Sequence, residues 1–242
     1  MRLGRYRFAP PLWAGVLTLA LLILFGNLGA WQLRRADDKR ALLAAQAQAA
    51  TEPAVDLAAW LKLGKPAPDL YSRAVTITGM PISERQLLHD SQTQGGRAGY
   101  HVWTALVLEG FQALVLVNRG WVPAAPDRES LPAVPLAEAM SVWRGQWRPL
   151  PEPGLRAGKN DCDRTRWPRV VQYPRGAELD CLFGQPVVAG ILLLDPDHPW
   201  GYSRDWHAEL LPPERHLAYA FQWFALSGAL LIVFIVVNLR KT

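Results

Sequence analysis

The sequence predicts a membrane protein in which two transmembrane α-helices flank a mainly antiparallel β domain of the α+β class, folded as a small barrel or a sandwich. Two apolar stretches without charged residues lie near the two ends of the 242-residue chain. Between them, short alternating or β-branched segments are separated by glycine and proline. The apolar stretches predict the anchors, and the segments between them predict the β domain.

The two anchors are expected at residues 12–32 and 216–239, because the charge-free runs from Leu12 to Ala30 and from Leu217 to Leu239 lie there. Roughly 20 apolar residues, at about 1.5 Å each, cross a hydrocarbon core of about 30 Å. The first run could instead be a cleaved signal peptide, since three arginines precede it. We favour a retained anchor, because the run is long and its end is a poor cleavage site.

Two anchors leave short tails, residues 1–11 and 240–242, on the same side of the membrane. Basic residues lie in these tails and also just beyond the first anchor, so their distribution alone does not fix the orientation. The net charge of +5 does not indicate nucleic acid, because no nucleic-acid motif accompanies it. Basic residues beside apolar spans favour contact with anionic lipid head groups of the bilayer.

Residues 33–70 are expected to form a helical juxtamembrane segment, because strong helix formers continue from the first anchor and recur at Leu57 to Leu63. Residues 71–215 form the predicted β-rich domain. Its expected strands are Ala74 to Gly79, Gln86 to Asp90, Tyr100 to Leu108, Ala113 to Asn118, Ser141 to Trp147, Val170 to Tyr173 and Val187 to Leu194. The third and fourth are expected to form a hairpin that turns near Gly110.

The backbone conformation at two glycines and the pairing of two cysteines in the central domain remain open. Gly79 and Gly145 each end a β-like segment and could mark a bulge or a sharp bend. Cys162 and Cys181 could form a disulfide if the domain is periplasmic, or remain free thiols if it is cytoplasmic.

No hydrolase elbow, Walker loop, dinucleotide fingerprint or paired-histidine metal motif occurs in the sequence, so we expect no catalytic or metal site. His216 opens the second anchor, and Tyr219, Ala220 and Trp223 share its helical face. This face could anchor the helix at the interface, as His, Tyr and Trp often do. It could also present an imidazole to haem or a metal, but the residues alone favour anchoring.

Arg119, in the segment Asn-Arg-Gly-Trp that ends with Trp121, could pair with an acidic partner protein or a propionate, or form a structural salt bridge. The remaining histidines carry no assigned role: His89, His101, His198 and His207.

The chain resembles the surfeit locus protein 1 family of cytochrome c oxidase assembly factors. The resemblance rests on the ordered motifs LGAWQLRR, VTITG, GGRAGYHVWTALVL, VLVNRGWVP followed by Arg128, SVWRG and PERHLAYAFQWF. It implies a bacterial inner-membrane protein with cytoplasmic termini and a periplasmic central domain. It also implies a role in building the haem-containing subunit of a terminal oxidase.

The resemblance implies haem A as a transient ligand, with His216 as its axial ligand and Tyr219 and Trp223 beside the macrocycle. Arg119 and Trp121 would then contact cytochrome c oxidase subunit I or haem A synthase. Two other functions stay open: a scaffold for oxidase subunits that never binds haem, and a membrane enzyme acting on a periplasmic substrate.

Overall fold

A computed structural model describes residues 2–3, 6–127, 130–152, 158, 160–206 and 212–241. The chain divides into two compact units, one made of Met1–Ala45 with His207–Thr242 and the other of Gln46–Trp206. His207, in the aromatic loop, and Arg128 lie outside the described residues.

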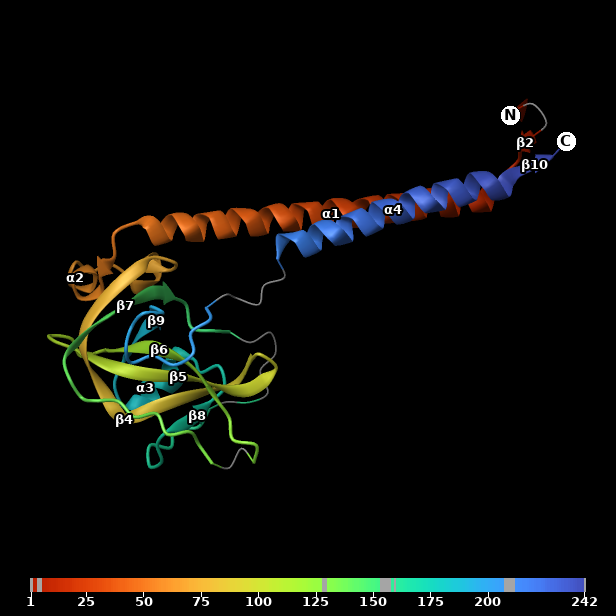
Figure 1. Cartoon of the computed structure of the whole chain (residues 1–242). Coiled ribbons are helices and arrows are strands. Elements are labelled where there is room, and N and C mark those ends of the chain that lie inside the picture. The colour runs from red at the N-terminus through yellow and green to blue at the C-terminus, as the bar shows by residue number, and fades with distance from the viewer. Residues whose placement is uncertain are drawn as a thin grey trace. The chain divides into compact units, whose positions relative to one another are not determined.

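The first unit contains α4 (Pro213–Asn238) and α1 (Leu12–Thr51) as far as Ala45, and in it the two long helices lie side by side (Figure 1). Both are long and apolar enough to cross a membrane. Short strands at the ends of the chain, β1 (Arg2–Leu3), β2 (Tyr6–Phe8) and β10 (Leu239–Lys241), form a three-stranded sheet. The predicted continuation of the first helix beyond its apolar run is confirmed.

Many large apolar side chains of α1 and α4 are exposed, among them Leu12, Phe221 and Val237 at 89%, 73% and 71%. A water-soluble protein rarely exposes so continuous an apolar surface. Polar residues along the helices bond to their own backbone: the Asn27 and Asn238 amides donate to the carbonyls four residues earlier. This arrangement satisfies polar groups within each helix, as a lipid environment requires.

The second unit begins with β3 (Val55–Asp56), α2 (Leu57–Lys62) and a short 3₁₀ helix, η1 (Ala67–Leu70). Asp56 caps α2 by accepting a hydrogen bond from the Ala59 amide, which fits the predicted second helix. The remaining elements are β4 (Ala74–Gln94), β5 (Arg97–Leu108), β6 (Leu114–Pro123), β7 (Ser141–Arg148), β8 (Arg169–Val171), α3 (Gly176–Phe183) and β9 (Val187–Leu194).

The sheet closes into a barrel, because β4, β5, β6, β9 and β7 pair in that order and β7 pairs back onto β4. This decides the open choice between a barrel and a sandwich. Four of the five pairings are antiparallel, while β6 and β9 are parallel. The small β3 and β8 also pair in parallel with β4, so the sheet is mixed.

Strand β4 joins two predicted strands into one, and its register with β5 shifts between Pro81 and Gln86. Its first part pairs with β7 and its second part with β8. The expectation of a bulge at Gly79 or Gly145 is wrong, because both glycines pair in register inside their strands. The predicted hairpin is confirmed, with Gly110 at φ +82° in its turn.

Helix α3 was not predicted, because its eight residues follow a proline-rich loop without a clear apolar period. Glu178 accepts a hydrogen bond from the Arg175 amide at its start, and Gly184 ends it at φ +77°. Cys181 of this helix forms a disulfide with Cys162, with the two Cα atoms 5.6 Å apart. The structure therefore favours the paired state of the two cysteines.

The barrel core is aromatic at its centre. Trp143 and Trp147 of β7 are completely buried and pack with aliphatic residues of β4, β5, β6 and β9. A second cluster lies between the sheet and α3, around Trp103 and Leu182.

Candidate functional site

His216 lies in the first turn of α4, three residues after Pro213, with which the helix begins. Its Nδ1 is 2.8 Å from the Gln32 Oε1 of α1. With the Gln32 amide oxygen as the acceptor, the tautomer that fits this contact carries its proton on Nδ1. The other ring nitrogen, Nε2, then keeps a free lone pair, which is the form of histidine that binds metals.

The predicted face around His216 is present, but its members differ in exposure. Ala220 is buried at 1% exposure and the Trp223 ring lies 5.6 Å from Phe25 of α1, whereas Tyr219 remains 46% exposed. His216 is half-buried. The structure thus brings His216 and Trp223 onto the side of α4 that contacts α1, and leaves Tyr219 accessible.

Gln32 was missed as a site residue, although it lies in the quoted segment LGAWQLRR. A glutamine near a predicted helix end gives no signal by itself, and only the packing of α1 against α4 brings it to His216. The donor set fits haem, because an oriented imidazole with one lone pair is a common axial ligand of haem iron. The hydrogen bond to Gln32 fixes the ring orientation, as second-sphere partners of metal-bound histidine do.

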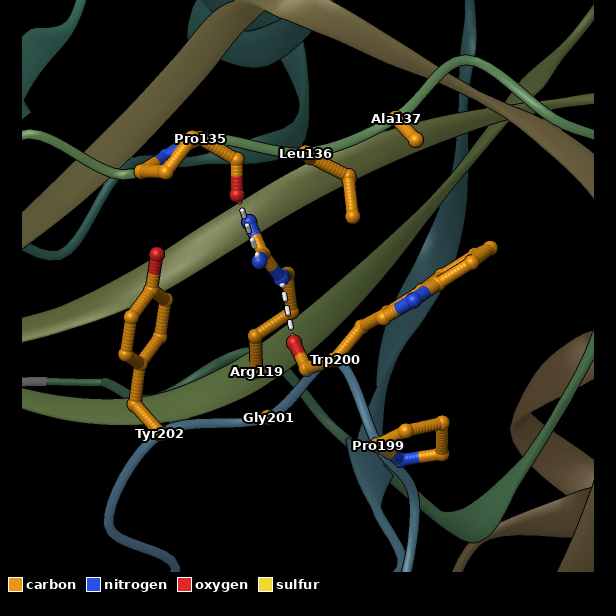
Figure 2. Close-up of a pocket in the computed structure, with 8 residues that line it drawn as sticks. All are labelled: Arg119, Pro135, Leu136, Ala137, Pro199, Trp200, Gly201 and Tyr202. Carbon is orange, nitrogen blue, oxygen red and sulfur yellow. Dashed lines mark hydrogen bonds between the residues drawn. The ribbon is translucent and has the colours of Figure 1, made fainter.

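Arg119 lies on β6 and is 3% exposed. Its Nε donates to the Trp200 carbonyl at 2.8 Å and its Nη2 to the Pro135 carbonyl at 3.2 Å. The Tyr202 ring lies 4.9 Å from the guanidinium carbon, a cation–π contact. Figure 2 shows the guanidinium between the Pro135 and Trp200 segments, with both hydrogen bonds drawn.

These residues line a pocket of about 560 Å³ in the β-barrel unit. Its other walls are largely apolar and come from two connecting segments, with Leu136 and Ala137 on one side and Pro199 on the other (Figure 2). A single cationic side chain in an apolar concavity is the usual composition of a site that recognises one charged group.

Burial lowers the pKa of Arg119, and the neighbouring Tyr202 hydroxyl partly offsets this effect. Arg119 Nη1 is shielded from solvent, and within the described part of the chain it has no hydrogen-bond partner. Among the described residues, no carboxylate forms an ion pair with this guanidinium, so the predicted structural salt bridge is absent from that part of the chain. A buried charge without a counter-ion costs several kcal/mol, so an incoming anion would be strongly favoured.

Trp121 does not line this pocket. Gly120, with φ +113°, separates it from Arg119, and its indole nitrogen donates to the Gln92 carbonyl at 3.3 Å. The indole instead covers Gly99 of β5, where an added Cβ would collide with the Trp121 ring. The structure therefore does not bring the two predicted partner-binding residues together in one pocket.

His198 lies beside the pocket and has a structural role in packing. Its ring stacks on Trp143 with 5.1 Å between centroids, and its Nε2 is 3.3 Å from the Val142 carbonyl. Burial lowers the pKa of His198, so the neutral ring is favoured here.

Comparison with known proteins bears out the resemblance seen in the motifs. A family model described as the SURF1 family matches residues 19–228, which include both the His216 and the Arg119 regions. The chain is similar to the cytochrome oxidase assembly protein SHY1 of Saccharomyces cerevisiae, with 26% identity over 192 residues, 76% of this chain and 47% of SHY1. It thus spans about half the length of this curated relative. The extent of the family match shows that the chain belongs to the SURF1 family.

Proposed function

We propose that this protein is an assembly factor for a haem–copper terminal oxidase of the cytochrome c oxidase type, and that it assists haem A insertion into subunit I. Family membership and the function for which SHY1 is named, cytochrome oxidase assembly, support the general role. The observation that carries the haem step is the His216–Gln32 hydrogen bond, which leaves Nε2 as a ligand atom. Subunit I or haem A synthase is the expected partner.

The proposed location is the bacterial inner membrane, with the β barrel in the periplasm and both termini in the cytoplasm. Two helices with continuous apolar surfaces support the two anchors. The Cys162–Cys181 disulfide supports a periplasmic barrel, because disulfides persist in oxidising compartments and are rare in the cytosol.

The orientation predicts how the thiols react in intact spheroplasts. A membrane-impermeant maleimide should leave the protein unmodified, and should add two labels after an impermeant reductant opens the disulfide. A Cys162→Ser variant should show one label without reductant, because Cys181 then lacks its partner. Labelling that requires lysis in every case would contradict the periplasmic position of the barrel.

The site would bind haem A through one protein ligand. His216 would hold the haem through Nε2, Gln32 would keep the imidazole in position, and Trp223 and the exposed Tyr219 would provide aromatic surface for it. When bound, haem A would supply an iron centre that accepts this nitrogen. A single histidine ligand allows the release that delivery to subunit I requires.

Replacing His216 with alanine should lower the Soret absorbance of protein purified from cells that make haem A by about 10-fold or more, because the axial nitrogen is removed. Gln32→Leu should weaken haem retention by about 10- to 100-fold, the usual range for a lost second-sphere partner. Gln222→Ala is the matched control, since Gln222 is exposed on the same helix. Equal Soret bands in all four proteins would exclude His216 as the ligand.

A scaffold that does not bind haem is the second candidate, and the Arg119 pocket is the observation that favours it. Its buried guanidinium has no carboxylate partner among the described residues and lies in the barrel unit, whereas His216 lies in the helical unit. Normal oxidase levels in a His216→Ala strain, together with a loss of oxidase in an Arg119→Gln strain, would support this candidate.

A further inference from the structure

The Arg119 pocket contains a positive charge that the described part of the chain does not neutralise. Two of the guanidinium nitrogens donate to the Trp200 and Pro135 carbonyls, and these bonds hold the group in place. The third, Nη1, is buried and has no hydrogen-bond partner among the residues that the structure describes. Carbonyl oxygens are dipoles and do not cancel a full charge, so the pocket favours an anion.

The residues around Nη1 indicate what kind of anion fits. Only one guanidinium nitrogen remains unpaired, and the walls are formed by proline, leucine, tryptophan and tyrosine side chains. Phosphate groups are commonly held by several donors at once. A carboxylate attached to an apolar body matches one open donor and apolar walls better, since the body can pack where the pocket is apolar.

The pocket is built to keep its shape. Val134 is buried in the cluster around Leu88 and Tyr100, and Leu136 packs against the central core. These two side chains fix the segment whose Pro135 carbonyl binds Arg119. Pro135 and Ala137 are exposed and form the rim, and no strand in the described part of the chain pairs with this segment. Because Nη1 is shielded from solvent, the proposal requires that a ligand displaces this rim outward to reach it.

The geometry points to a docking site for an acidic segment of a partner protein, in which a glutamate or aspartate carboxylate accepts from Arg119 Nη1 and a neighbouring apolar side chain packs on Leu136 and Trp200. The identity of the partner as an oxidase assembly component rests on the proposed function. The carboxylate recognition does not, because it follows from the pocket alone. Arg119 is a binding residue here, whereas Trp121 lies outside the pocket.

The test uses the full chain in mild detergent and a blocked dipeptide probe, acetyl-leucyl-glutamate amide, with the glutamine version as its matched control. Calorimetric titration should show saturable binding of the glutamate probe, with affinity at least about 10-fold higher than for the glutamine probe, or about 1.4 kcal/mol. Inorganic phosphate, tested alone, should bind more weakly than the glutamate probe.

Three variants complete the experiment. Arg119→Gln should lose the preference for the glutamate probe, and Ala137→Trp should lose binding by filling the pocket while leaving both Arg119 hydrogen bonds intact. Arg85→Gln, at an exposed arginine of the same domain, should bind like the parent protein. The Soret band of each variant is recorded in parallel, so that failure of carboxylate recognition and failure of haem binding are seen separately.

Equal affinity for the two dipeptides, no binding of the glutamate probe at millimolar concentration, or full binding by both Arg119→Gln and Ala137→Trp would overturn the proposal. Tighter binding of phosphate than of the glutamate probe would also overturn it, in favour of a phosphate site.

Discussion

Replacement of Gly145 by valine is expected to prevent the β barrel from folding. Gly145 lies in β7, where it pairs with Val75 of β4 on one side and with Leu194 of β9 on the other. A Cβ added there would collide with the Leu193 carbonyl. The obstacle is backbone at the seam that closes the barrel, so no rotamer change can relieve it.

The expected loss is about 3 kcal/mol or more, since an inserted side chain in a tightly packed core costs about 1–3 kcal/mol even where neighbouring side chains can move. A typical domain has only about 5–15 kcal/mol of stability. Chemical unfolding of the full chain in detergent, followed by tryptophan fluorescence, measures the change. Trp143 and Trp147 of the same strand report directly on the barrel core.

Gly176→Val is the matched control, because an added Cβ at Gly176 meets no atom within 4 Å and its backbone has no positive φ. We expect this variant to unfold close to the parent protein. A Gly145→Val protein with an unchanged unfolding midpoint would show that β4 and β9 can separate at this position, contrary to the closed barrel.

Acidification is expected to lower the free energy of unfolding of the β barrel, through two buried histidines on neighbouring strands. His89 of β4 pairs with His101 of β5, and the two rings lie 6.5 Å apart. Burial, together with the charge of His101, lowers the pKa of His89 to about 3, although Asp90 opposes the shift. Burial lowers the pKa of His101 to about 4. Across the described ranges of the chain, neither ring nitrogen of His89 has a hydrogen-bond partner.

The direction in which stability changes with pH follows from whether the folded or the unfolded chain binds more protons. Above pH 6.5, both rings are neutral in the folded and the unfolded chain, so the full stability is present. Below pH 6.5, the unfolded chain takes up protons first, and stability falls until the folded rings also protonate, near pH 4 and pH 3. Between pH 7 and pH 5 each histidine should remove about 2 kcal/mol from the free energy of unfolding.

Urea unfolding at pH 7, 6 and 5 would measure this loss of about 4 kcal/mol in total. His89→Phe should remove about half of the pH dependence, since phenylalanine can retain the stacking on Trp103 but cannot be protonated. A parent protein whose stability does not change over this range would show that the two rings are hydrated in solution.

The helices and most strands could be predicted from the sequence because their signals are local. Charge-free runs predict α1 and α4, and alternating residues predict β5, β6, β7 and β9 within a few residues. The motifs of the family are also sequence patterns, and they were sufficient to identify its membership. His216 and Arg119 stood out for the same reason.

Closure of the barrel, the Gln32–His216 bond and the Arg119 pocket depended on the tertiary structure. Each joins residues distant in the chain: β7 closes onto β4, Gln32 lies 184 positions from His216, and Arg119 binds carbonyls 16 and 81 positions away. Local periodicity records which side of an element is apolar, but not which other element covers it. The sequence therefore determined the elements and the family, and packing decided which polar groups meet and which one remains unpaired.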